Sequence, residues 1–377
     1  MCIMEEFKKI KATVEYQGYY YKLSDVIKIS ILGLLSRQQT MKDIHGWAES
    51  KPVREMLKEK FNIKKLPCYS QFTNIIGIID SNELNTIFME FFCKLVEIAG
   101  KTVAIDGKTV CSTGNMSSFE SPLHIASAFV VENGITIGQL ATDAKSNEIP
   151  AVQELIRLLN IEGATVVADA LNCQKETVKE ILDAGADYVL SVKKNQKELY
   201  SDIEQMIEFK CNDKYEQLNS PIEKTTKIEK SHGRIEKRTA LVTQEVQWLQ
   251  DRDEWFGINT IGAIITESQT RYYISSRVLS AEQLLTITRN EWGVTNFGLP
   301  KLCMHWQLDV IFDEDRTTLH EKNAQFTLNI LRKTVLNIVR TYRDMFEPKL
   351  NMVDILRKCS HDTDILLDVL AKFNDCV

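Results

Sequence analysis

The chain has 377 residues, 44% of them hydrophobic and 26% charged, a composition typical of soluble globular proteins with two or three domains and a large core. Nine scattered cysteines without zinc-ligand or redox spacing predict reduced thiols, and the absence of a long apolar run or a signal-peptide pattern predicts a cytoplasmic protein without membrane contact. The formal net charge of −6 argues mildly against a nucleic-acid partner, unless local patches of basic residues provide the contacts.

The first part of the chain, residues 1–98, is predicted to be a helical domain. Apolar residues at helical spacing predict helices at 23–35, 41–49 and 74–79, and a further helix that begins near Ser81, which can cap it. Short helices with tight turns suit a DNA-binding module of the helix-turn-helix kind. A plain helical bundle has the same pattern, and the sequence alone slightly favours the bundle.

Residues 102–210 alternate between strand and helix patterns. An apolar run ends on Asp106, two strands at 124–131 and 136–142 flank a turn at Asn133-Gly134, and a helix follows Pro150. A second apolar run ends on Asp169, a helix stops at Gly185, and a last strand covers 188–192. The predicted fold class is α/β, a mixed sheet with helical crossovers.

The remainder of the chain begins with strands and turns and then returns to helices. Strands are expected at 238–242, 260–266 and 272–275, within a β-rich insertion at about 220–278. Helices are expected at 281–292 and 323–342. We therefore expect a second domain over 99–345 that contains the insertion, followed by a helical tail at 346–377.

The two aspartates that end apolar runs indicate chemistry. A buried strand that stops on a carboxylate places a charge at the rim of a sheet, and neighbouring strands would bring Asp106 and Asp169 together. Like charges at that distance repel unless a divalent cation lies between them, which favours metal-assisted phosphoryl chemistry. Each aspartate alone has an ordinary alternative, a hairpin turn at Asp106-Gly107 and a helix N-cap at Asp169.

A series of short motifs resembles one family. The motifs are Ala104–Thr109, His124–Phe129, Lys145–Ile149, Asp169–Gln174, Lys193–Gln196, His232–Glu236 and His305–Val310. In this order they resemble the insertion-sequence transposases of the ISAs-one, or H-repeat-associated, group, which have an Asp-Asp-Glu metal site on a ribonuclease H-like fold. The match runs over roughly residues 90–330 and is looser in the amino-terminal domain.

The resemblance implies a function and a set of partners. Asp106 and Asp169 correspond to the first two metal-binding acids, with Mg²⁺ or Mn²⁺ as the cofactor. The implied activity is cleavage and transfer of strands at transposon ends, with double-stranded DNA of those ends and of the target as partner, in the bacterial cytosol. The oligomeric state is open, and a homodimer is one candidate.

The third acid is missing from its expected place. The family has a glutamate in a helical Trp-x-Ile/Val-Glu-Asn segment, and the corresponding residue here is Thr295, followed by an insert at 297–304 that contains Gly298 and Pro300. A hydroxyl is a poor substitute for a carboxylate on a hard cation. Glu291 lies one turn earlier, about 6 Å along a helix, so it replaces the missing acid only if the helix slides.

Other acids are weaker candidates, and three functional interpretations compete. Asp309, Asp313, Glu314 and Asp315 could belong to the site, but a solvated acidic turn is the ordinary alternative. The main interpretation is a transposase impaired by Thr295, and a catalytically inactive DNA-binding remnant is the alternative. An unrelated metal-dependent nuclease or phosphatase does not explain the ordered motifs.

Two groups of basic residues are candidates for contacts with the DNA backbone. Lys227, Lys230 and Arg234 lie in a basic segment at 223–238, for which a solvated hairpin is the alternative. A second group follows a strand on the expected active-site edge: Lys193, Lys194 and Lys197. Three further residues have open roles: capping, a salt bridge or catalysis for Glu148, and packing under the site or in the core for His305 and Trp306.

Overall fold

The structure is a computed structural model that describes residues 3–15, 20–110, 122–142, 148–211, 222–231, 234–295, 304–316, 319 and 321–376. For residues 229–231, 234–235, 290–295 and 316 it describes the backbone alone. All six cysteines with described side chains are free thiols, as the scattered spacing predicts. No described helix is both long enough and apolar enough to cross a bilayer.

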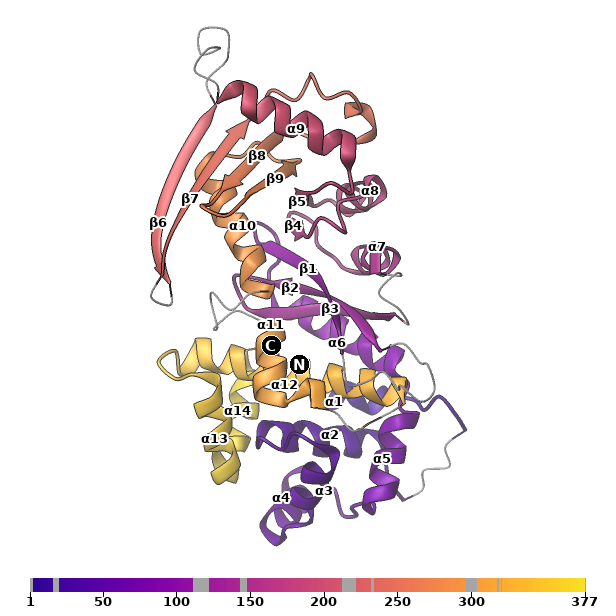
Figure 1. The fold of residues 1–377 in the computed structure, drawn as a ribbon. Helices are drawn as coiled ribbons and strands as arrows, with labels where there is room; N and C mark the ends of the chain where they lie inside the picture. The colour runs from indigo at the N-terminus through magenta and orange to yellow at the C-terminus, as the bar shows by residue number, and fades with distance from the viewer. Residues whose placement is uncertain are drawn as a thin grey trace.

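Nine strands in the described ranges form one mixed sheet (Figure 1). Their order across the sheet is β3-β2-β1-β4-β5-β9-β8-β7-β6. Strand β1 runs antiparallel to β2 and parallel to β4, and β4 runs parallel to β5. The strands are β1 (Thr102–Thr109), β2 (His124–Val130), β3 (Ile135–Thr142), β4 (Thr165–Ala168), β5 (Asp187–Val192), β6 (Glu223–Ser231), β7 (Arg234–Thr243), β8 (Thr260–Ile265) and β9 (Thr270–Ser275).

The first five strands confirm the predicted ribonuclease H-like mixed sheet. Every residue of β2 and β4 is buried, because helices cover both faces of the sheet there, and this explains why β4 reads as a continuous apolar run. The predicted β-rich insertion is present, and it continues the same sheet. Strand β9 pairs antiparallel with β5, so the strands from β6 to β9 extend the sheet beyond its five-stranded part.

Helices cover the two faces of the sheet in separate groups. On one face lie α7 (Glu148–Leu158), α8 (Lys175–Asp183) and α9 (Lys197–Lys210). On the other lie α10 (Ala281–Thr295), α11 (Met304–Phe312) and α12 (Lys322–Phe346). The side chain of Asp106 points to the second face, since the residue directly opposite it, Ser127, bonds to α12 through Lys333. Gly107 therefore points to the first face.

The amino-terminal part is helical, as predicted, with two corrections of detail. Helices α2 (Leu23–Leu35) and α3 (Met41–Glu49) have the predicted bounds. Helix α5 (Tyr69–Ile78) begins five residues earlier than predicted, directly after its N-cap Cys68. Helix α6 (Ser81–Leu95) is capped by Asp80, whose carboxylate accepts the N–H groups of residues 82 and 83, and not by Ser81. Helices α1 (Ile3–Glu6) and α4 (Lys51–Phe61) complete this part.

The carboxyl-terminal helices pack against the amino-terminal ones. Helix α12 contacts α2, α5 and α6, and its apolar residues at helical spacing, Leu328, Leu331, Val335 and Ile338, are buried. Helices α13 (Met352–His361) and α14 (Thr363–Asp375) pack against α12 in turn. Both ends of the chain therefore lie on the same side of the sheet (Figure 1). The domain boundaries near residues 98 and 345 stay a prediction.

Candidate active site

The two aspartates lie next to each other on parallel strands of the sheet, Asp106 within β1 and Asp169 directly after the last residue of β4. Ile105 of β1 is paired with Ala168 of β4. Asp106 directly follows Ile105, and Asp169 directly follows Ala168. Neighbouring strands are about 4.8 Å apart, so both acids belong to one edge of the sheet. In addition, the backbone N–H groups of Leu171 and Asn172 donate to Oδ1 of Asp169, at 3.1 and 3.3 Å.

The electrostatics of this edge suit a cation. Burial raises the pKa of the Asp169 carboxyl, and the negative charges of Asp106 and Glu148 raise that pKa further, while hydrogen bonds from Asn172 lower it. The net shift is upward, which means that the ionised form of Asp169 is disfavoured by its surroundings. A bound divalent cation would relieve this repulsion, so the residues present fit the metal that the resemblance implies.

His305 is a site residue whose position the sequence left open. Its Nε2 lies 3.1 Å from Oδ2 of Asp106, although the two residues are 199 positions apart in the chain. The histidine is on α11, which packs at the end of α10. Of the two roles left open for His305, the contact with Asp106 supports a place at the site over simple packing in the core. The only sequence signal for this contact was that His305 begins the His305–Val310 motif.

The acidic turn after α11 is engaged with β1. Glu314 is 1% exposed, and its carboxylate accepts hydrogen bonds from Lys108 (2.9 Å) and Asn329 (2.6 Å). Burial alone would raise the pKa of Glu314, but the positive charges of Lys108 and Arg332 outweigh it and lower that pKa. Lys108 also donates to Asp309. The expectation of a solvated turn is therefore wrong for Glu314, and its carboxylate already has partners.

Helix α10 carries the third-acid position and packs against the two strands that lead to Asp106 and Asp169. The helix packs against β1 and β4, and it ends at Thr295 (Figure 1). The side chains of Glu291 and Thr295 and the whole of 296–303, with Gly298 and Pro300, lie outside the described residues. Among the side chains that are described, no three His, Cys, Asp or Glu residues converge as a ready metal site. The described residues thus supply two candidate metal ligands, Asp106 and Asp169.

Comparison with known proteins places this geometry in a family. Residues 99–338 match the family described as Transposase DDE domain. The chain belongs to the DDE transposase family. Residues 4–92 of the transposase match the DDE_Tnp_1-associated family, which covers the helical amino-terminal part.

Full-length relatives of the transposase agree with this assignment. The H repeat-associated putative transposase YhhI of Escherichia coli (strain K12) is 31% identical over 367 residues, with 93% of each chain covered. The putative transposase YncI of Escherichia coli O157:H7 is 29% identical over 339 residues, with 86% of this chain and 84% of YncI covered. A piggyBac transposase synaptic complex with hairpin DNA matches 98% of this chain and 76% of its own chain, with 11% identity and a TM-score of 0.48. The family and its relatives identify an insertion-sequence transposase.

The lysines after β5 lie on the same edge as the two aspartates. Strands β4 and β5 are parallel, so the residues that follow each strand meet at one edge. Lys193, Lys194 and Lys197 are exposed there, the last of them as the first residue of α9. Asn195 donates to the carbonyl of Ala170 at 2.7 Å, which ties this loop to the one that carries Asp169.

The second basic group, on the β6–β7 hairpin, is divided between the two faces of the sheet. Lys227 and Lys230 are three residues apart on β6, and successive residues of a strand alternate between its two faces, so the two positions belong to opposite faces of the strand. Arg234 pairs with Ser231 in register and therefore shares the face of Lys227. The Lys227 ammonium lies 3.1 Å from a carboxylate oxygen of Glu282 on α10. The side chains of Lys230 and Arg234 lie outside the described residues.

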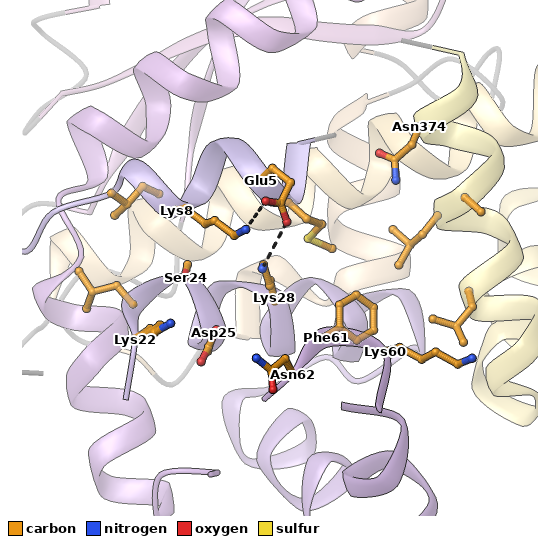
Figure 2. Close-up of a pocket in the computed structure, with 16 residues that line it drawn as sticks. Glu5, Lys8, Lys22, Ser24, Asp25, Lys28, Lys60, Phe61, Asn62 and Asn374 are labelled. Carbon is orange, nitrogen blue, oxygen red and sulfur yellow. Dashed lines mark hydrogen bonds and ion pairs between the residues drawn. The ribbon is translucent and has the colours of Figure 1, made fainter. Parts of the chain in front are cut away.

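A separate cavity of about 990 Å³ lies between the two ends of the chain (Figure 2). It is lined by parts of α1, α2, α4 and α14. Figure 2 shows Glu5 between Lys8 and Lys28, with the Lys28 ammonium 4.0 Å from the carboxylate. Since its lining residues belong to 4–62 and 367–374, the cavity is distinct from the strand edge that carries Asp106 and Asp169.

Proposed function

We propose that this transposase cleaves and joins DNA strands at the ends of its insertion sequence through a divalent cation held by Asp106 and Asp169. The observation that carries the proposal is that Asp106 directly follows Ile105 and Asp169 directly follows Ala168, two residues that are paired between the parallel strands β1 and β4. When bound there, Mg²⁺ or Mn²⁺ supplies Lewis-acid stabilisation of charge at the reacting phosphate. A homodimer as the working assembly stays a prediction.

The protein's own residues have distinct parts in this proposal. His305 orients the carboxylate of Asp106 through Oδ2, and the N–H groups of the following turn orient that of Asp169 through Oδ1. The exposed Lys193 and Lys194 on the same edge are suited to hold the phosphates of double-stranded DNA. Orientation of both acids and of the DNA strand places a phosphate next to the cation site.

An inactive DNA-binding remnant is the second candidate function. The observation that favours it is Thr295 at the end of α10, where the helix lies against β1 and β4. A hydroxyl leaves the cation short of one carboxylate. Contacts with the DNA backbone rest on other residues, so binding does not require the third acid.

The proposal is tested by metal binding and DNA binding measured separately. We expect Asp106→Asn and Asp169→Asn each to lose measurable Mn²⁺ binding by calorimetry, because each removes one of the two charges that attract the cation. Both variants should retain the gel-shift affinity for DNA that carries the inverted repeats flanking the gene. Asp183→Asn, an exposed position on α8, is the matched control. Mn²⁺ binding that survives both active-site changes would refute the proposed metal site.

A further inference from the structure

A buried acid–imidazole pair lies on the α7 side of the two acid-bearing strands. Glu148, the first residue of α7, is 4% exposed, and His124, the first residue of β2, is 1% exposed. Oε2 of Glu148 lies 2.7 Å from Nε2 of His124. The other ring nitrogen, Nδ1, lies 2.9 Å from the hydroxyl of Thr109, which connects the pair to β1. A carboxyl group this deeply buried is costly to keep unless it is fully partnered.

The second oxygen of Glu148 reaches Asp169 through one side chain. Nδ2 of the buried Asn172 donates to Oε1 of Glu148 at 3.0 Å and to Oδ1 of Asp169 at 3.1 Å. One amide nitrogen therefore bridges the two carboxylates. The flipped amide would turn a carbonyl oxygen toward both negative groups, so Glu148 and Asp169 together determine how Asn172 is oriented.

Gly107 shows how closely the pair approaches the first aspartate. A Cβ atom on this residue would lie 2.5 Å from Nε2 of His124 and 2.6 Å from Oε2 of Glu148, closer than such atoms can stand. Glycine has no Cβ atom, so only glycine at position 107, next to Asp106, leaves room for Glu148 and His124 against β1. The pair thus contacts β1 at Gly107 and Thr109 and reaches Asp169 through Asn172.

We propose that Glu148 is a positioning residue of the metal site, which holds Asp106 and Asp169 in their relative placement through His124 and Asn172. This role rests on the proposed function of the two aspartates. Glu148 acts through other residues, because its two oxygens already bond to His124 and Asn172. Partners of this kind keep metal ligands oriented, and their loss typically weakens metal affinity by about 10–100-fold.

The experiment measures the Mn²⁺ dissociation constant of the full chain by calorimetry, at a temperature where each variant is folded by circular dichroism. Glu148→Gln keeps the size and removes the charge, and Asn172→Ala removes the bridge. We expect each to raise the dissociation constant by about tenfold or more. Glu154→Gln, an exposed position on the same helix, should bind as the parent does. A purely structural role would lower the melting temperature of the first two variants without changing the dissociation constant.

The outcomes separate this inference from the function on which it rests. If Asp106→Asn and Asp169→Asn abolish Mn²⁺ binding while Glu148→Gln and Asn172→Ala bind as the parent does, the positioning role is wrong and the metal site stands. If the parent does not bind Mn²⁺, or the aspartate variants bind it normally, both proposals are overturned. Should Glu148→Gln not fold, Asn172→Ala alone decides, and its unchanged dissociation constant refutes the role.

Discussion

Lys333 is a fully buried lysine whose ionisation the fold makes costly. Its ammonium donates to the Ser127 hydroxyl at 2.7 Å and to the Gln139 amide oxygen, which connects α12 to β2 and β3. Burial lowers the pKa of Lys333 to about 7, and the nearby Glu314 opposes that shift. An unfolded lysine has a pKa of about 10.4. Between these values the unfolded chain binds one more proton than the folded chain, so stability rises with pH there.

We therefore predict that Lys333→Met flattens the pH dependence of stability. Between pH 7.5 and 9.5 the unfolding free energy of the parent should rise relative to the variant by up to about 1.4 kcal/mol per pH unit, since one titrating group is removed. Urea unfolding followed by circular dichroism at several pH values measures this difference. Lys349→Met, at an exposed position, is the control. Parallel pH profiles for parent and Lys333→Met would show that Lys333 titrates normally in the folded protein.

At the scale of elements, α10 determines how complete the candidate site is. The helix lies against β1 and β4, so a carboxylate near its end would be close to both aspartates. Thr295 and Glu291 are four residues apart and share one face of the helix, one turn from each other. A change at either position therefore tests which register of the helix the site uses.

We predict that Thr295→Glu gains metal-dependent cleavage of transposon-end DNA, alone or combined with shortening between Asn296 and His305. The new carboxylate supplies the ligand that a hydroxyl cannot. Glu291→Ala should change little, because it lies a turn away from the required position. The measurement is strand cleavage in Mg²⁺ and in Mn²⁺. Efficient cleavage by the parent that Glu291→Ala abolishes would identify Glu291 as the third acid and contradict this prediction.

For DNA binding by the whole molecule, the positions of the charged residues matter more than the net charge. The net charge is −6, yet Lys193, Lys194 and Lys197 are gathered at the edge that carries the two aspartates. The hairpin residues Lys227 and Lys230 occupy positions on opposite faces of β6, and Lys227 already pairs with Glu282. The strand-edge lysines should therefore contribute more to the binding of a DNA duplex at the active-site edge than the hairpin lysines do.

We predict that the salt dependence of DNA binding follows this difference. Replacing Lys193, Lys194 and Lys197 with alanine should reduce the slope of log affinity against log salt by about 0.9 for each DNA phosphate that the protein no longer neutralises. Replacing Lys227, Lys230 and Arg234 should reduce it less. Fluorescence anisotropy over a range of salt concentrations measures both slopes, with Lys349→Ala as control. If the slope of the first variant equals that of the parent, the strand-edge lysines are not in the interface.

Local patterns were sufficient to predict the elements that carry the two aspartates. The apolar runs before Asp106 and Asp169 predict buried strands, because a strand covered on both faces contains almost no polar residues. Helix α3 has the predicted bounds because its capping box, Thr40 with Asp43, lies within its own sequence. The order of motifs indicated the family, and the matches with known transposases confirm it.

Only the tertiary structure decided which distant side chains meet at the site. His305 contacts Asp106 across 199 residues, and Glu314 contacts Lys108 across 206 residues. No local pattern contains such a pair, because both depend on how α11 packs against β1. The acidic run 313–315 looks like a solvated turn in sequence, and burial beside Lys108 and Arg332 makes Glu314 part of the core. Sequence thus determined the strands and the family, while the packing of helices on the sheet determined which distant residues lie beside the acids.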